Sequence, residues 1–164
     1  MPKFVRQGNN TLVGNNTFTG TNTFTGPVVA SGGITGNVTG GATRLVAAQA
    51  TGTKAVSAAE SGTMFVNTQG ASTTTFTLPS AAAGLTYTFV ESNASGEILI
   101  TPASGDAIVG KIHAAQDGTA MAPAAGTGIK NTAATNVAGD SITLVALNDT
   151  TWYVVAQTGL WASQ

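Results

Sequence analysis

The side chains that could do chemistry are few in this chain and widely scattered. His113 is the single histidine, and the sequence contains no cysteine. A zinc site needs several nitrogen or sulfur ligands at set spacings, so this histidine predicts a structural role. The seven carboxylates are Glu60, Glu91, Glu97, Asp106, Asp117, Asp140 and Asp149. Nothing in their spacing indicates an acid/base pair. We therefore expect no catalytic residue, no cofactor and no metal, and predict that the chain is not an enzyme.

Aromatic residues near the C-terminus are the second group with chemical potential. Trp152, Tyr153 and Trp161 could stack on the faces of sugar rings. Neighbouring residues of a strand point to opposite sides, so at least one of Trp152 and Tyr153 is predicted to lie in a core or a subunit interface. Trp152 and Trp161 are the candidate glycan-binding or interface aromatics.

Short strands separated by turns must position these side chains. From Arg44 onward, threonine and β-branched or aromatic residues dominate, which is typical of pleated, half-buried strands. The predicted strands are Arg44–Ala50, Thr63–Asn67, Thr73–Leu78, Thr86–Glu91, Glu97–Thr101, Ala107–His113, Ser141–Leu147 and Trp152–Gln157. Residues 114–138 are predicted to form a long loop with one short strand around Gly128–Asn131.

Turn residues mark several of the joints between these strands. Asn148-Asp-Thr-Thr151 between two apolar runs predicts a hairpin. Gly105-Asp106 and Gly139-Asp140 are each followed by a β-forming run, so both pairs predict a turn that launches a strand.

Composition sets limits on the partners of the chain. Charged residues make up 8% of the 164 positions, against roughly 25% in ordinary soluble domains. The net charge is −1 and the six basic residues are scattered, which argues against nucleic-acid binding. The sequence shows neither a signal-peptide core nor an apolar run of about 20 residues, so we expect no membrane association and synthesis in the cytoplasm. A polar but uncharged surface suits a protein that works inside an assembly.

The N-terminal part of the chain is a hexad repeat. The repeated glycines are Gly8, Gly14, Gly20, Gly26 and Gly32. Successive units carry one large apolar side chain each, namely Leu12, Phe18 and Phe24. One apolar residue per unit cannot bury itself in an isolated strand, so the repeat must stack against neighbouring units.

Two architectures would bury these side chains. A single-chain β-helix would have fewer than two coils here, whereas solenoids usually need about three stacked units. Three chains around a common axis would stack the same side chains in layers, and each buried Phe contributes on the order of 2 kcal/mol. The homotrimer is therefore favoured. A hexapeptide acyltransferase is rejected because the residue before each glycine turns from Val13 to Thr19 and Thr25.

These observations predict an all-β protein of two parts. Residues 1–43 form a trimeric hexad-repeat β-stalk or arm, in which Leu12, Phe18 and Phe24 pack at the trimer axis. Residues 44–164 form an antiparallel β-sandwich or jelly-roll-like domain.

Several segments resemble structural proteins of tailed bacteriophages. The repeats Asn15-Asn-Thr-Phe-Thr-Gly20 and Thr21-Asn-Thr-Phe-Thr-Gly26 resemble those of phage fibrous proteins. The stretches that are similar to segments of phage virion proteins are Phe76–Phe89, Ile98–Asp106, Gly139–Leu147 and Trp152–Trp161. The resemblance implies a virion structural role, as a trimeric capsid decoration (cement) protein or a short head fibre, and carries no catalytic residue.

The expectation that follows is a homotrimer on the outer surface of the capsid, bound to the major capsid protein and stabilising the head. Lys3, Phe4 and Arg6 precede the repeat and are the predicted capsid contact. Attachment through the C-terminal domain stays open. The alternative is a short phage fibre or adhesin that binds a host surface glycan.

Overall fold

The computed structural model describes residues 19–21, 23, 45–50, 52–114, 120–122, 127–132 and 134–164. The chain divides into two compact units, Met1–Gly41 and Ala42–Gln164. The predicted trimer-packing and capsid-contact residues lie outside the described residues; they are Leu12, Phe18, Phe24, Lys3, Phe4 and Arg6. These assignments stay predictions.

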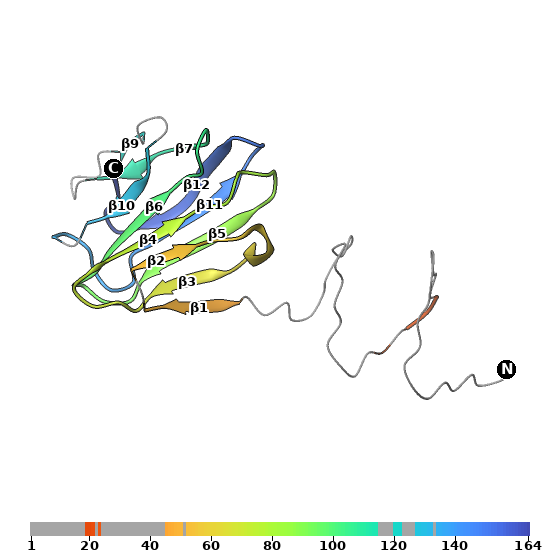
Figure 1. Ribbon diagram of the computed structural model, residues 1–164, viewed down its shortest axis with the longest axis horizontal. Helices are drawn as coiled ribbons and strands as arrows, with labels where there is room; N and C mark the ends of the chain where they lie inside the picture. Colours follow the sequence, from red (N-terminus) through yellow and green to blue (C-terminus); the bar gives the residue numbers. More distant parts are fainter. Residues whose placement is uncertain are drawn as a thin grey trace. The chain divides into compact units, whose positions relative to one another are not determined.

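The regular secondary structure of the second unit is almost entirely β-strand, as predicted (Figure 1). Sheet A contains, in spatial order, β1 (Val46–Gln49), β3 (Met64–Asn67), β5 (Thr86–Glu91), β11 (Ser141–Ala146), β12 (Thr151–Thr158) and β7 (Ala107–Val109). Sheet B contains β13 (Ala162–Ser163), β10 (Ile129–Asn131), β6 (Glu97–Thr101), β4 (Thr73–Thr77) and β2 (Thr53–Ala55). A separate pair joins β8 (Ile112–His113) to β9 (Ala120–Met121), and a single 3-10 turn, η1, spans Ala58–Glu60 in the described part of the chain.

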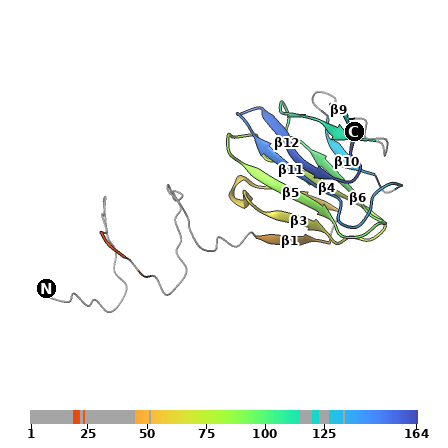
Figure 2. The same cartoon turned by 180° about the vertical axis from the view of Figure 1, so that it is seen from behind.

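The first six strands alternate between the two sheets, one strand at a time. Strands β1, β3 and β5 lie parallel to one another in sheet A, and β2, β4 and β6 lie parallel in sheet B. Because each link crosses to the other sheet before the chain returns, a strand arrives beside its predecessor running in the same direction. Figure 2 shows the same strands from behind, from the side of sheet A. The prediction of an antiparallel domain is therefore wrong for this half, whose links are crossings rather than hairpins.

Most of the later strands extend the sheets in the antiparallel sense, whereas β7 runs parallel to β12. Strand β11 pairs with β5 and then with β12, and β10 pairs with β6. The predicted hairpin at Asn148 is confirmed, since Oδ1 of Asn148 accepts a 2.9 Å hydrogen bond from the backbone N–H of Thr150. The predicted short strand at Gly128–Asn131 is confirmed as β10.

Two turns with the same hydrogen-bond pattern directly precede β7 and β11. The N–H of Asp106 donates to the carbonyl of Ala103 at 3.0 Å, and the N–H of Asp140 donates to the carbonyl of Val137 at 3.0 Å. The glycine before each aspartate has a positive φ, +90° and +101°, which a residue without a Cβ adopts at low cost. Both Gly-Asp predictions are thus confirmed.

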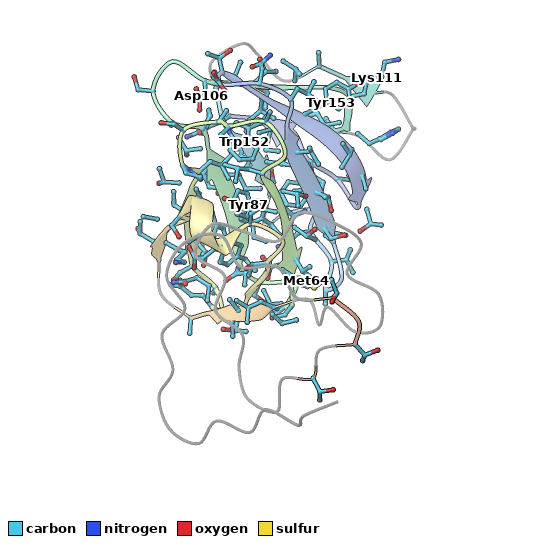
Figure 3. All side chains as sticks on the ribbon, turned by 90° about the vertical axis from the view of Figure 1, so that its right-hand side faces the viewer. Met64, Tyr87, Asp106, Lys111, Trp152 and Tyr153 are labelled. Carbon is cyan, nitrogen blue, oxygen red and sulfur yellow. The ribbon has the colours of Figure 1, made fainter. Side chains whose placement is uncertain are left out.

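The core lies between the two sheets and is rich in aromatic side chains. The ring centroid of Phe89 lies 5.7 Å from that of Phe65 and 4.9 Å from that of Phe76. Tyr87 packs against Trp152 with ring centroids 5.6 Å apart. Figure 3 shows Tyr87 and Trp152 between the sheets. This cluster joins strands of both sheets, so the two layers form one hydrophobic core.

Candidate functional site: polar clusters and the outer faces of the sheets

Buried polar residues at one end of the interior are the first place to look for chemistry. Glu91 is fully buried, and its Oε2 accepts a 2.8 Å hydrogen bond from the side-chain amide of Asn67. Oδ1 of Asn67 accepts a hydrogen bond from Thr74 at 2.7 Å. This network connects β3 and β5 to β4 of the other sheet. A general acid or base must reach its substrate, so a carboxyl enclosed in this way is a structural element.

Asp140 is the centre of a second buried cluster. Its Oδ2 accepts hydrogen bonds from the side-chain amide of Asn131 at 2.9 Å and from the backbone N–H of Val137 at 3.0 Å. Asp106 is also buried, and its Oδ2 accepts a 2.7 Å hydrogen bond from the N–H of Ala81. Each carboxyl accepts hydrogen bonds from backbone or amide groups of the fold, which accounts for its burial without a ligand.

A partly exposed ion pair couples η1 to β2. Nζ of Lys54 lies 2.7 Å from Oε1 of Glu60, while Oε2 of Glu60 accepts a 2.8 Å hydrogen bond from the N–H of Ser57. Burial alone would raise the pKa of Glu60, but the hydrogen bonds from Lys54 and Ser57 outweigh burial and lower it. Tyr87 donates a hydrogen bond to the carbonyl of Ser57 at 2.9 Å. Burial, followed by the charge of Glu60, raises the pKa of Tyr87.

The candidate metal ligand and the candidate glycan aromatics take ordinary structural places. His113 is exposed in β8, and the described residues contain no group of three or more His, Cys, Asp or Glu side chains that could hold a metal ion. Trp152 and Trp161 are both fully buried. A glycan-binding or interface role does not fit that burial, because neither ring can meet a molecule outside the chain. Their neighbour Tyr153 is 41% exposed on the opposite side of β12, as strand alternation predicts.

The outward side chains of the strands of sheet A form rows without charged residues, here called the valine-rich face. Strand register aligns its side chains in rows that run across the strands. One row is Val46, Met64, Thr88, Thr143 and Ala156; the next is Ala48, Val66, Val90, Ser141 and Thr158; a third is Thr86, Val145, Tyr153 and Val109. Apolar and hydroxyl side chains make up all three rows. Figure 3 shows Met64 and Tyr153 on the same outward side of the sheet.

Sheet B presents a different outward surface, here called the threonine face. Its outward residues are Thr53, Ala55, Thr73, Thr75, Thr77, Glu97, Leu99, Thr101, Lys130 and Ala162. Threonine dominates, and a carboxylate and an ammonium are present. Water therefore solvates this face better than the valine-rich face, so the two sides of one domain differ in character.

Four hydroxyl groups of the valine-rich face are hydrogen-bonded in pairs. Oγ1 of Thr88 lies 2.8 Å from Oγ1 of Thr143, and Oγ of Ser141 lies 3.0 Å from Oγ1 of Thr158. Each pair spans two neighbouring strands. Hydroxyls paired in this way lose less on leaving water than hydroxyls whose partners are all solvent.

Comparison with protein-family models gave no match, and neither did comparison with curated proteins. Among the described residues, no helix has the length and apolar character that crossing a membrane requires.

The sequence reasoning missed the valine-rich face, although a signal for it was present. In Thr86–Glu91 and Ser141–Ala146, large apolar residues alternate with Thr, Ser and Val. The large residues face the core, and the alternate positions define the outward surface. The valine-rich face arises only when six such strands lie side by side in one sheet, and the sequence pattern does not show that order.

Proposed function

We propose that this chain is a capsid decoration protein of a tailed phage, which binds the outside of the head as a homotrimer and stabilises it. The observation that carries the proposal is the valine-rich face, whose uncharged rows span the six strands of sheet A. The buried carboxyls of the same domain accept hydrogen bonds from other groups of the chain. Such a surface is typical of a subunit of an assembly. The resemblance of the hexad repeats to phage fibrous proteins supports the same function.

Attachment by three copies makes a weak contact effective. When three equivalent contacts belong to one particle, binding of the second and third is intramolecular and the overall avidity rises steeply. In this proposal Leu12, Phe18 and Phe24 join the three arms, and Lys3, Phe4 and Arg6 contact the major capsid protein. The product is made in the host cytoplasm and ends on the virion surface.

Co-sedimentation with capsids that were assembled without this protein tests the proposal. The full-length chain should bind the capsids at many copies per particle and raise the temperature at which they open. The variant Lys3→Ala/Arg6→Ala should bind more weakly, and Lys130→Ala, a basic position on the threonine face, is the matched control. Absence of capsid binding would refute decoration, and glycan-array binding in its place would favour the adhesin alternative.

A further inference from the structure

We propose that the valine-rich face of sheet A packs against the same face of two further copies of this chain, around the three-fold axis of the trimer. The inference rests on the homotrimer of the proposed function and names the surface through which the second unit joins it. Three sheets would stand as the sides of a triangular prism, each with its outward rows directed at the axis. A three-fold contact of this kind is heterologous, since different strands of one face meet their counterparts on the next chain.

The first argument is the absence of charge from a surface of this size. The three rows from Val46 to Val109 contain apolar and hydroxyl side chains alone. Val46 is 59% exposed, Val155 at the bulge in β12 is 52% exposed and Tyr153 is 41% exposed. The threonine face of the same domain carries Glu97 and Lys130. One side of the domain therefore has the composition of an interface and the other that of a solvent-exposed surface.

The second argument is area. Five gaps between six strands at roughly 4.8 Å give a width of about 24 Å, and about five residues at about 3.3 Å give a length near 16 Å. The flat area is roughly 400 Å² before the relief of the side chains is included. Monomers rarely leave larger patches in water. Three such faces around one axis would together bury roughly 1,200 Å², divided among three contacts, so the faces act together with the arms rather than alone.

The third argument concerns the cost of removing the face from water. The hydroxyls of Thr88 and Thr143 bond to each other at 2.8 Å, and those of Ser141 and Thr158 bond at 3.0 Å. Burial against another chain leaves these hydrogen bonds intact. The face therefore loses little polar solvation and gains the burial of its valines and Tyr153.

The occupant is a second copy because charge and chain connectivity both favour it. A face without charge gains nothing from an acidic or basic partner, whereas an identical face is equally neutral. Strand β1, the edge strand of sheet A, follows directly after the arm that is predicted to trimerise. Three arms that come together would bring three copies of this sheet to a high effective concentration, and the contact between the faces would in turn be needed to keep the arms associated.

The test uses the full-length chain and a matched pair of substitutions. Val145→Glu places a carboxylate on the valine-rich face, and Thr75→Glu places the same group on β4, an interior strand of sheet B. Both positions are β-branched, half-buried and outward-facing. Light scattering after size exclusion should give the unaltered chain and Thr75→Glu three times the 16.2 kDa mass of one chain. Val145→Glu should fall towards the single-chain mass, with circular dichroism confirming that the sheets persist.

A second variant covers the case in which Val145→Glu fails to fold. Tyr153→Lys alters a more exposed position on the same face and should also lower the mass. Face variants that fold and keep the trimer mass would overturn the inference, even if they still bind capsids, in which case decoration stands. A trimer that dissociates as expected but never binds capsids would support the inference and refute decoration.

Discussion

The side-chain amide of Asn67 donates a 2.8 Å hydrogen bond to Oε2 of Glu91, and both side chains are completely buried. The same asparagine accepts a hydrogen bond from Thr74, which belongs to sheet B. One residue thus links two neighbouring strands of sheet A and reaches across the core to the opposite layer. Its polar atoms cannot turn to water if a partner is removed.

Replacing Asn67 with alanine is expected to lower the free energy of unfolding by about 1–3 kcal/mol, because Glu91 and Thr74 would both lose a buried partner. Urea titration followed by fluorescence of the buried tryptophans measures the change. Asn148→Ala is the control, since its hydrogen bonds lie in an exposed turn, and should cost less than about 1 kcal/mol. Equal losses for the two variants would contradict the buried network.

Gly159→Ala is expected to destabilise the domain more than Gly84→Ala. Both glycines have positive φ, +76° and +91°, so an added Cβ strains each backbone by about 1 kcal/mol. At Gly84 the new atom meets open space, whereas at Gly159 it would overlap the carboxyl group of Asp140. Overpacking of this kind adds about 1–3 kcal/mol. Thermal unfolding of the two variants side by side checks the order, and equal losses at the two positions would contradict the Asp140 contact.

Phe89→Ala is expected to cost about 3–5 kcal/mol of stability, because this ring contacts both Phe65 and Phe76 at the centre of the core. Denaturant unfolding gives the value. Leu147→Ala provides the comparison: its side chain is 55% exposed, so the change should stay within about 0.5 kcal/mol. A small loss at Phe89 would mean that the two sheets do not share one core.

Stability should decline at alkaline pH, and Tyr87→Phe should remove part of that decline. Burial, and then the charge of Glu60, raises the pKa of Tyr87 in the folded chain. The folded state holds the phenol proton more tightly than the unfolded state. The stabilisation is therefore complete below about pH 10 and is lost as the pH rises through the higher folded value. Unfolding free energies at pH 8 to 11 for both chains measure the difference; identical alkaline slopes would contradict it.

At acid pH, the stability of the domain is expected to depend on Glu60. Although burial works against it, hydrogen bonds from Lys54 and Ser57 lower the pKa of this carboxyl in the folded chain. Its contribution is present above the unfolded value of about 4.3 and disappears as the pH falls through the lower folded value. Glu60→Gln should cost roughly 1 kcal/mol at neutral pH and flatten the acid limb. An acid limb that is unchanged in the variant would exclude this role.

Most of the strands were predictable because their residues alternate strongly. Thr73–Leu78, Thr86–Glu91 and Glu97–Thr101 correspond to β4, β5 and β6. The predicted strand Ala107–His113 is divided at Gly110, where φ is +120° and a Cβ would lie 3.1 Å from Val154. Strands β2 and β13 are two or three residues long and too short for a periodic signal.

The parallel winding of β1 to β6 was not predictable from these local patterns. Alternation shows that a strand has an inner side but does not show which strand lies next to it. The candidate functional surfaces were unpredictable for the same reason, because they depend on which strands are neighbours. Strand alternation predicted that Trp152 or Tyr153 would be buried, but it did not show which of the two. The burial of Trp161 follows from contacts made by the chain end, which no local pattern contains. The uncharged face required the order of all six strands in sheet A.

The alternation of β1 to β6 between the two layers gives the domain an adjustable length. A circuit here means one strand in each sheet. A further circuit inserted between β2 and β3 would pair with the strands on either side of it, and all other strand pairs would stay as they are. Relatives of this protein could therefore differ by whole circuits, each adding one strand's width to both layers. The aromatic centre and the antiparallel cap at β10 to β12 would carry over unchanged.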